Sequence, residues 1–238
     1  MTKPVLIMKT GETLAPLRAR GEDFEDWIEA GLGLTSAQLS IRHVARGQPL
    51  PGVAEVAGVV ITGSPAMLTD GAPWNEVAAQ WLREALACEL PVLGICYGHQ
   101  LLAHACGGRV DYHPQGREIG TVPVALAPSA CADVLLGALP ATFAAHTTHS
   151  QSVLQLPPTA TLLASSVHDR HQAYRVGASA WGVQFHPEFT AEVMRTYVRE
   201  RQQALQAEGF DVEALLRDVQ ETPAASGVLR RFAALCGF

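Results

Sequence analysis

The stretch PVLGICYGHQ, residues 91–100, decides the fold of this 238-residue chain. Residues 91–95 form a short apolar run, typical of a strand buried on both faces. Residues 97–106 have helical composition until the glycine pair at 107–108 stops the helix. Between strand and helix stands Cys96, flanked by glycines in a G-x-Cys-x-G arrangement. In this context such a turn forms a nucleophile elbow, which predicts a reactive Cys96.

The residues around Cys96 suit this interpretation. Side chains at Gly94 and Gly98 would collide with the neighbouring strand and helix, so glycine is expected at both positions. Unpaired N–H groups and the positive end of the helix dipole would favour the attacking thiolate. The alternative is that Cys96 is a small buried residue, as most free cysteines are.

Working outward, short apolar runs alternate with helical segments along the first half of the chain, which favours a mostly parallel sheet covered by helices. Strands are expected at residues 5–8, 39–44, 56–62 and 91–95, with helices at 24–32 and from Pro73. Between about 109 and 185, extended pieces suggest antiparallel additions to this α/β sheet; they lie at 121–126, 161–167, 172–176 and 181–185.

The chain is interpreted as one domain, residues 1–238, because its length and hydrophobic content suit a single core. From Thr190 it turns helical again, and residues 191–238 are expected to form a C-terminal extension packed on that domain. One helix face is predicted to carry Val193, Met194, Tyr197, Val198 and Leu205, with two shorter helices following.

A second motif, QFHPE at residues 184–188, offers the base that a thiolate nucleophile needs. In an extended run, residues two apart point the same way, so His186 and Glu188 can lie on one side. Pro187 biases His186 toward extended backbone angles. His186 would take and return the proton while Glu188 orients its ring. The alternatives are a satisfied core or surface histidine and a solvated loop glutamate.

Amide chemistry also needs donors aimed at the oxyanion. One would be the backbone N–H of Tyr97, directly after the nucleophile, and the second could come from the turn at Gly63-Ser64-Pro65. The alternative is an ordinary turn with no part in catalysis, and without Cys96 this would be the preferred interpretation.

Composition excludes several classes of function. The net charge is −6, and the Lys and Arg residues are scattered, so we expect no nucleic-acid partner. The apolar run near the amino terminus is too short for a signal or a membrane span, so we expect a cytoplasmic protein. Five cysteines without a CxxC pair argue against disulfides and structural zinc. Phosphate-binding and dinucleotide-binding glycine motifs are absent, so no cofactor is expected. His99 and His104 lie off a shared helix face, and Thr147–Ser150 is expected to be a polar loop, so a metal site built from them is not expected either.

Together, GICYGHQ at 94–100 and FHPE at 185–188 resemble the class I, triad-type glutamine amidotransferase family. REIG at 117–120 is similar to a segment in the amidotransferase part of GMP synthetases. The resemblance implies a three-layer α/β/α, flavodoxin-like fold. It also implies Cys96 as nucleophile, His186 as base and acid, Glu188 as the residue orienting His186, and an oxyanion hole at the backbone of Ser64 and Tyr97.

In such relatives the amino-acid end of the substrate is held near the elbow helix and a histidine-containing loop. That maps to five residues of this chain: Gly63, Gln100, His149, Ser150 and Gln151. Two departures stand out. Many relatives have Gly-Gly-Pro where this chain has Gly63-Ser64-Pro65, which narrows the space beside the substrate. No segment resembles a synthetase module, so a separate synthetase chain would have to use any ammonia.

Three functions stay open at this point. The first is a glutaminase-type amidotransferase that forms a γ-glutamyl thioester on Cys96 and releases ammonia and glutamate. The second keeps the chemistry but cleaves γ-glutamyl peptides or amines, and a roomy pocket beyond Cys96 would support it. The third is a non-catalytic module that binds a metabolite for regulation.

Overall fold

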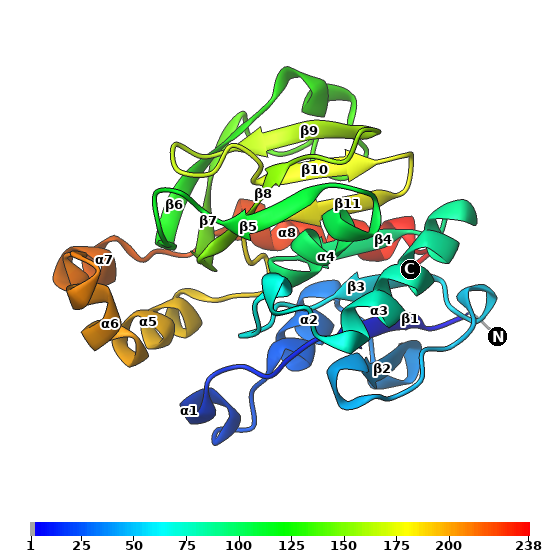
Figure 1. Ribbon diagram of the computed structural model, residues 1–238, viewed down its shortest axis with the longest axis horizontal. Helices are drawn as coiled ribbons and strands as arrows, with labels where there is room; N and C mark the ends of the chain where they lie inside the picture. Colours follow the sequence, from blue (N-terminus) through cyan, green and yellow to red (C-terminus); the bar gives the residue numbers. More distant parts are fainter. Residues whose placement is uncertain (1–2) are drawn as a thin grey trace.

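A large mixed sheet forms the centre of the computed structural model, which describes residues 3–238 (Figure 1). In sheet order its strands are β2 (Leu39–His43), β1 (Val5–Lys9), β3 (Gly58–Ile61), β4 (Val92–Ile95), β11 (Ala180–Val183), β10 (Ala173–Val176), β9 (Ala160–Ser165), β6 (Glu118–Leu126) and β7 (Thr142–His149). The strands from β2 to β11 run parallel, and those from β10 to β7 are antiparallel. A two-stranded ribbon pairs β5 (Arg109–Tyr112) with β8 (Gln151–Gln155).

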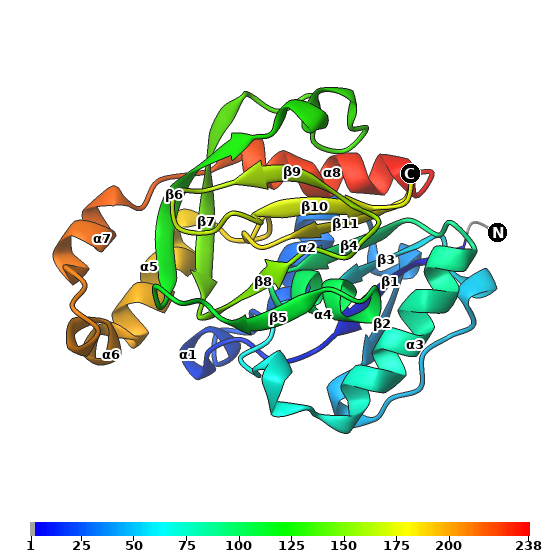
Figure 2. The same cartoon turned by 45° about the horizontal axis from the view of Figure 1, so that its top comes forward.

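Helices cover both faces of this sheet and one end of it (Figure 2). They are α1 (Ala15–Arg18), α2 (Phe24–Leu32), α3 (Pro73–Ala87), α4 (Tyr97–Ala105), α5 (Ala191–Glu200), α6 (Gln202–Ala207), α7 (Val212–Asp218) and α8 (Pro223–Leu235). Short 3-10 turns lie at Ser36–Gln38, Val44–Arg46, Val53–Glu55, Leu68–Asp70 and Pro128–Ala132. No helix within residues 3–238 combines the length and apolarity needed to cross a membrane.

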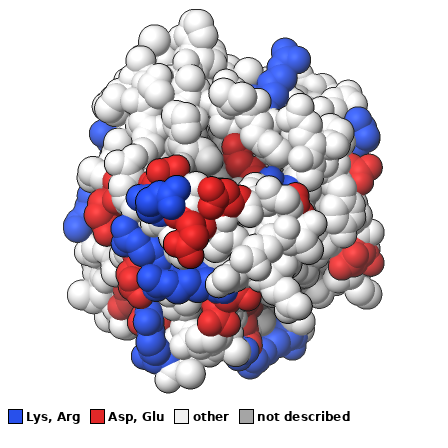
Figure 3. Space-filling view, turned by 90° about the vertical axis from the view of Figure 1, so that its left-hand side faces the viewer, with Lys and Arg blue, Asp and Glu red and all other residues white. Residues whose placement is uncertain are grey.

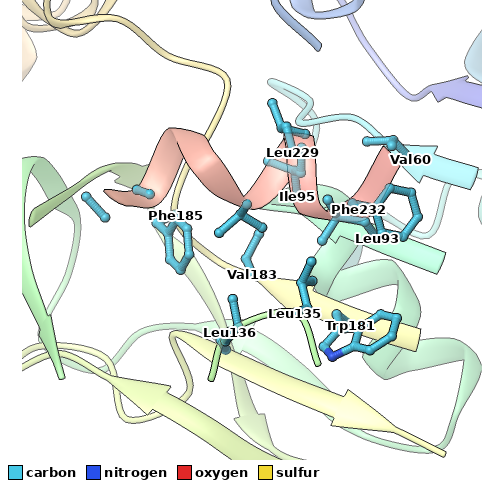
Figure 4. Packing of buried hydrophobic residues seen from close by; sticks show 14 of the residues in the cluster. Val60, Leu93, Ile95, Leu135, Leu136, Trp181, Val183, Phe185, Leu229 and Phe232 are labelled. Carbon is cyan, nitrogen blue, oxygen red and sulfur yellow. The ribbon is translucent and has the colours of Figure 1, made fainter. Parts of the chain in front are cut away.

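Alternation along the parallel strands divides the core into two layers. Successive strand residues point to opposite faces, so Val5 and Ile7 pack with α2 and α8, whereas Leu6 and Met8 pack with α3 and α4. Figure 4 shows the first layer, in which Leu229 and Phe232 of α8 lie over the sheet. A third cluster joins α5, α6 and α7 to the loop around α1 and to β6. The predicted three-layer α/β/α fold, mostly parallel with antiparallel additions, is confirmed.

Two local predictions were wrong. The segment Thr147–Ser150 was expected to be a polar loop, but Thr147 to His149 belong to β7. Its polar residues are accommodated because β7 pairs with β6 along its whole length, which satisfies the backbone. The helix that begins after Thr190 ends before Arg201, so Leu205 lies in the separate helix α6, and α8 is longer than α5 rather than shorter.

The connection from β4 to α4 adopts the strained geometry predicted for an elbow. Cys96 has φ 50° and ψ −98°, a left-handed conformation that is costly for a residue with a side chain. A Cβ on Gly94 would lie 2.4 Å from the Gly98 carbonyl oxygen, and one on Gly98 would lie 2.5 Å from the Ile61 carbonyl oxygen. Both contacts involve backbone, which cannot move aside without shifting β3, β4 or α4.

This packing predicts that Gly98→Ala destabilises the protein by about 1–3 kcal/mol or more, because overpacking outweighs the gain in helix propensity. The matched control is Gly227→Ala in α8, where an added Cβ meets no atom within 4 Å. That change should raise the free energy of unfolding by about 0.5–1 kcal/mol, since alanine restricts the unfolded chain. Urea denaturation followed by circular dichroism measures the free energy of unfolding of both variants. A Gly98→Ala protein as stable as the wild type would contradict the packing described.

Candidate active site

The carboxyl ends of neighbouring parallel strands bring the predicted site residues together. Cys96 follows β4, the turn at Gly63 and Ser64 follows β3, and His186 follows β11. Strand β11 pairs with β4 in parallel register, and the N–H of Cys96 donates to the Val183 carbonyl at 2.9 Å. Open α/β sheets bind their ligands at this edge. The two motifs, ninety residues apart in sequence, therefore meet in space.

His186 and Glu188 form a close buried pair. The His186 Nδ1 lies 2.7 Å from a carboxylate oxygen of Glu188, and both side chains are almost fully buried. The Phe189 ring stacks on the imidazole at 4.1 Å between centroids, and the His186 N–H donates to the His146 carbonyl at 2.8 Å. These contacts fix the ring. The opposite nitrogen, Nε2, is buried and has no hydrogen-bond partner within residues 3–238, so it is free to exchange a proton.

Electrostatics favour a protonated His186. Burial alone would lower its pKa, but the charges of Glu188 and Cys96 and the hydrogen bond to Glu188 outweigh this effect and raise the pKa to about 10. The neighbouring His146 differs, because burial and the positive His186 lower its pKa to about 4. One of two adjacent imidazoles is thus held charged and the other neutral, and the charged one faces the thiol.

Backbone donors stand beside Cys96. Tyr97 is the first residue of α4, where an N–H has no intrahelical acceptor. Within residues 3–238, neither its N–H nor that of Ser64 donates a hydrogen bond to the protein. The Ser64 hydroxyl turns toward β1 and donates to the Thr10 carbonyl at 3.0 Å. A Cβ on Gly63 would lie 3.1 Å from the His186 ring, so the absence of a side chain at Gly63 leaves room for the imidazole.

Two pockets meet at Cys96. The first, of about 60 Å³, lies toward α4 and the turn between β7 and β8. Besides Tyr97, its lining includes five of the predicted substrate-binding or oxyanion residues, namely Ser64, Gln100, His149, Ser150 and Gln151. The sixth, Gly63, lines neither pocket. The second, of about 250 Å³, lies toward His186, the loop before α1, and α5. Cys96 is 6% exposed, so these pockets are its access routes.

The predicted substrate residues are held rigidly by one another. The Gln100 amide nitrogen donates to the Gln151 carbonyl at 2.8 Å and to the Gln184 side chain at 3.1 Å, which leaves the Gln100 carbonyl oxygen available. Both ring nitrogens of His149 are engaged, Nε2 with Glu118 at 3.0 Å and Nδ1 with the Gln151 carbonyl at 3.0 Å. His149 therefore supports the wall of the first pocket, and the backbone beside it faces the cavity.

Several pocket residues were missed by sequence reasoning. Thr148 and Arg201 line both pockets, and Arg117 lines the first. In the second, Thr13 bonds the Tyr197 hydroxyl at 2.7 Å, which ties the loop before α1 to α5. Thr148 could have been found as a strand residue beside His149, but Arg201 stands in a charged helical segment with no distinguishing signal. Residues 3–238 contain no cluster of three or more His, Cys, Asp or Glu side chains placed to hold a metal.

Known proteins resemble this chain in sequence and in fold. The family model for class I glutamine amidotransferases matches residues 23–203. The chain belongs to this family. A GMP synthase [glutamine-hydrolyzing] of Aeropyrum pernix is 38% identical over 144 residues, covering 60% of this chain and 26% of that protein. Gamma-glutamyl peptidase 3 of Arabidopsis thaliana is 31% identical over 142 residues, covering 58% and 56%.

The matched amidotransferase region is thus about a quarter of that GMP synthase and just over half of the peptidase. Among solved structures, a glutamine amidotransferase of Thermotoga maritima superposes with a TM-score of 0.79 at 22% identity, over 100% of both chains. This likeness extends the common fold to the C-terminal helices α7 and α8 of the present chain, which lie beyond the region that the family model matches.

The raised pKa of His186 has a consequence for stability. Its unfolded pKa is about 6.5, so the charged imidazole stabilises the fold fully below pH 6.5, and this contribution is lost as pH rises toward about 10. Glu188→Gln removes the main attractive charge and should flatten the fall in unfolding free energy across this window. Urea denaturation at pH 6 to 10 measures it.

The exposed pair of Glu76 and His104, whose facing atoms lie 2.6 Å apart, provides a matched control. Glu76→Gln should leave the pH profile as in the wild type, because solvent screens an exposed pair. Equal profiles for the wild type and Glu188→Gln would show that Glu188 does not hold the charge on His186.

Proposed function

We propose that the chain hydrolyses the side-chain amide of glutamine through a γ-glutamyl thioester on Cys96. The observation that carries this proposal is the arrangement of Cys96 at the junction of two pockets, beside a buried His186 that Glu188 fixes at 2.7 Å. Nucleophile, proton carrier and orienting acid form the set that acyl transfer through a cysteine requires. Membership of the class I glutamine amidotransferase family supports it.

In the first step the Cys96 sulfur attacks the amide carbon while protonated His186 faces the reaction. The negative oxygen that develops is met by the N–H groups of Ser64 and Tyr97, which have no acceptor of their own. As the carbon–nitrogen bond breaks, His186 Nε2 gives its proton to the leaving nitrogen, and ammonia departs. A γ-glutamyl thioester and a neutral imidazole remain.

In the second step, neutral His186 takes a proton from a water molecule, which attacks the thioester at the same carbon. The carbon–sulfur bond breaks, glutamate leaves, and the thiolate and imidazolium are restored. The sum is glutamine and water giving glutamate and ammonia. Glu188 holds Nδ1 in place throughout, so that Nε2 alone carries the transferred proton.

The first pocket suits the glutamyl part of the substrate. Its volume of about 60 Å³ is narrow, and polar groups from α4 and from the turn after β7 line it. The Gln100 carbonyl oxygen is free to accept from an ammonium group, since its amide nitrogen is already bonded. Ser150 lies between β7 and β8, where its backbone can contact the amino-acid end.

A second candidate function is hydrolysis of γ-glutamyl peptides or amines by the same chemistry. The second pocket carries it, because about 250 Å³ far exceeds the ~10–15 Å³ that a molecule of the size of water or ammonia needs. His186 lines that pocket and not the first, so the leaving nitrogen faces the larger space. The resemblance to Gamma-glutamyl peptidase 3 supports this candidate.

A partner belongs to the first candidate only. If ammonia is the useful product, a separate synthetase chain would take it up. The similarity to a GMP synthase supports this, because the region matched by this chain makes up only 26% of that protein. If a γ-glutamyl peptide is the substrate, no acceptor enzyme is needed. The surface at the α5–α7 end interleaves acidic and basic side chains and has no extended patch of one sign (Figure 3).

Cys96→Ala should abolish release of ammonia and glutamate, with a loss of at least about 10³-fold, because no other group can form the thioester. Cys88→Ala, at an exposed cysteine, serves as control and should keep full activity. A coupled glutamate assay measures turnover, and circular dichroism checks the fold. Turnover by Cys96→Ala would refute the mechanism, and a wild type unreactive toward thiol-directed glutamine analogues would favour the metabolite-binding module.

The two candidates differ in a single comparison of kcat/KM for glutamine and for a γ-glutamyl dipeptide. If the second pocket binds the leaving group, the dipeptide should be preferred by about tenfold or more, since remote contacts are used to lower the barrier. Preference for glutamine would instead support the ammonia-producing candidate. Both rates are obtained with the same protein preparation, with Cys96→Ala as the blank.

A further inference from the structure

Arg201 occupies an unusual place in the molecule. It stands at the break between α5 and α6, and its half-buried side chain lines both pockets beside Cys96. Its Nε is buried and has no hydrogen-bond partner within residues 3–238. The guanidinium packs against the Tyr197 ring at 5.6 Å. A buried donor without an acceptor is costly, which calls for a ligand that supplies one.

Three other charged groups near the two pockets, those of Arg117, Lys9 and Glu12, already have partners of opposite charge. Arg117 makes two hydrogen bonds to Glu208, at 2.9 and 3.1 Å, and Lys9 lies 2.7 Å from Asp23. At the second pocket, the Glu12 carboxylate is paired with Arg18 and Arg46. Within the described chain, Arg201 has no carboxylate within 4.0 Å.

The chemistry indicates which part of a substrate would reach Arg201. His186 must hand its proton to the leaving nitrogen, and His186 lines the second pocket only. The leaving group therefore extends into the second pocket. Among the described residues, Arg201 supplies the one guanidinium that lines this pocket, and Glu12, which also lines it, is already paired with Arg18 and Arg46. Guanidinium groups bind carboxylates through paired N–H donors, and a partly buried one does so more strongly than an exposed one.

We propose that Arg201 binds the carboxylate of the leaving amino acid, so that the enzyme prefers γ-glutamyl amino acids to γ-glutamyl amines. This inference rests on the second candidate function. In a γ-glutamyl amino acid, one carbon separates the leaving nitrogen from the carboxylate. Anchoring the carboxylate therefore also positions the nitrogen beside His186. A leaving amine that carries a second, positively charged ammonium group would be repelled by the same guanidinium.

The test uses two substrates that differ only at the proposed contact: γ-glutamylalanine, with a free carboxylate, and γ-glutamylalaninamide, without one. In the wild type we expect a kcat/KM ratio of at least about ten in favour of the acid. Arg201→Met should bring this ratio close to one, chiefly by raising KM for the acid. Arg201→Lys should restore part of it, because it keeps the charge without the planar fork.

Arg199→Met is the matched control, since Arg199 is exposed in the last turn of α5, next to Arg201, and lines neither pocket. Its ratio should equal that of the wild type. A wild-type ratio near one overturns the proposal without any variant, as does an equal loss for both substrates in Arg201→Met. Absence of Cys96-dependent turnover for every γ-glutamyl compound would instead refute the proposed function, so the two failures are distinguishable.

Discussion

The left-handed backbone at Cys96 is the constraint on which the rest of the site depends. A residue with a side chain adopts φ 50° only where its surroundings hold it there. Here β4 and α4 are pressed against each other and against β3, with no room for a Cβ at Gly94 or Gly98. The strain brings the thiol to the carboxyl edge of the sheet and aims the first N–H groups of α4 at the same point.

The change from parallel to antiparallel pairing supplies the other half of the site. Strand β11 is the last parallel strand, and its end lies beside that of β4, so His186, far along the chain, meets Cys96. Beyond it, the turn from β7 to β8 forms the wall of the first pocket. Glu118, buried in β6, holds that wall through His149, Gln172 and Ser166. A row of buried polar contacts thus links the antiparallel strands to the edge of the sheet that carries Cys96.

Sequence alone could predict the parts that local rules determine. The elbow glycines, the apolar strand before Cys96 and the short spacing of His186 and Glu188 each follow from backbone geometry, and the structure brings these residues together. The strands β7 and β8 were not predicted, because their polar residues are satisfied by hydrogen bonds to partners that are distant in sequence. Arg201 could not be predicted either. It stands out because its guanidinium has no carboxylate partner among the described residues, and the absence of a partner is visible only in the three-dimensional structure.

The hydrogen bond between Thr13 and Tyr197 joins two segments that lie far apart in the sequence. Thr13 precedes residue 23, where the match to the family model begins, and Tyr197 lies near its end at residue 203. Both residues line the second pocket, whereas Cys96 and His186 follow strands of the central sheet. One wall of that pocket is therefore built from two segments that a single side-chain bond ties together. Loss of this tie would loosen the wall while the strained thiol and its imidazole, held by the sheet, keep their places.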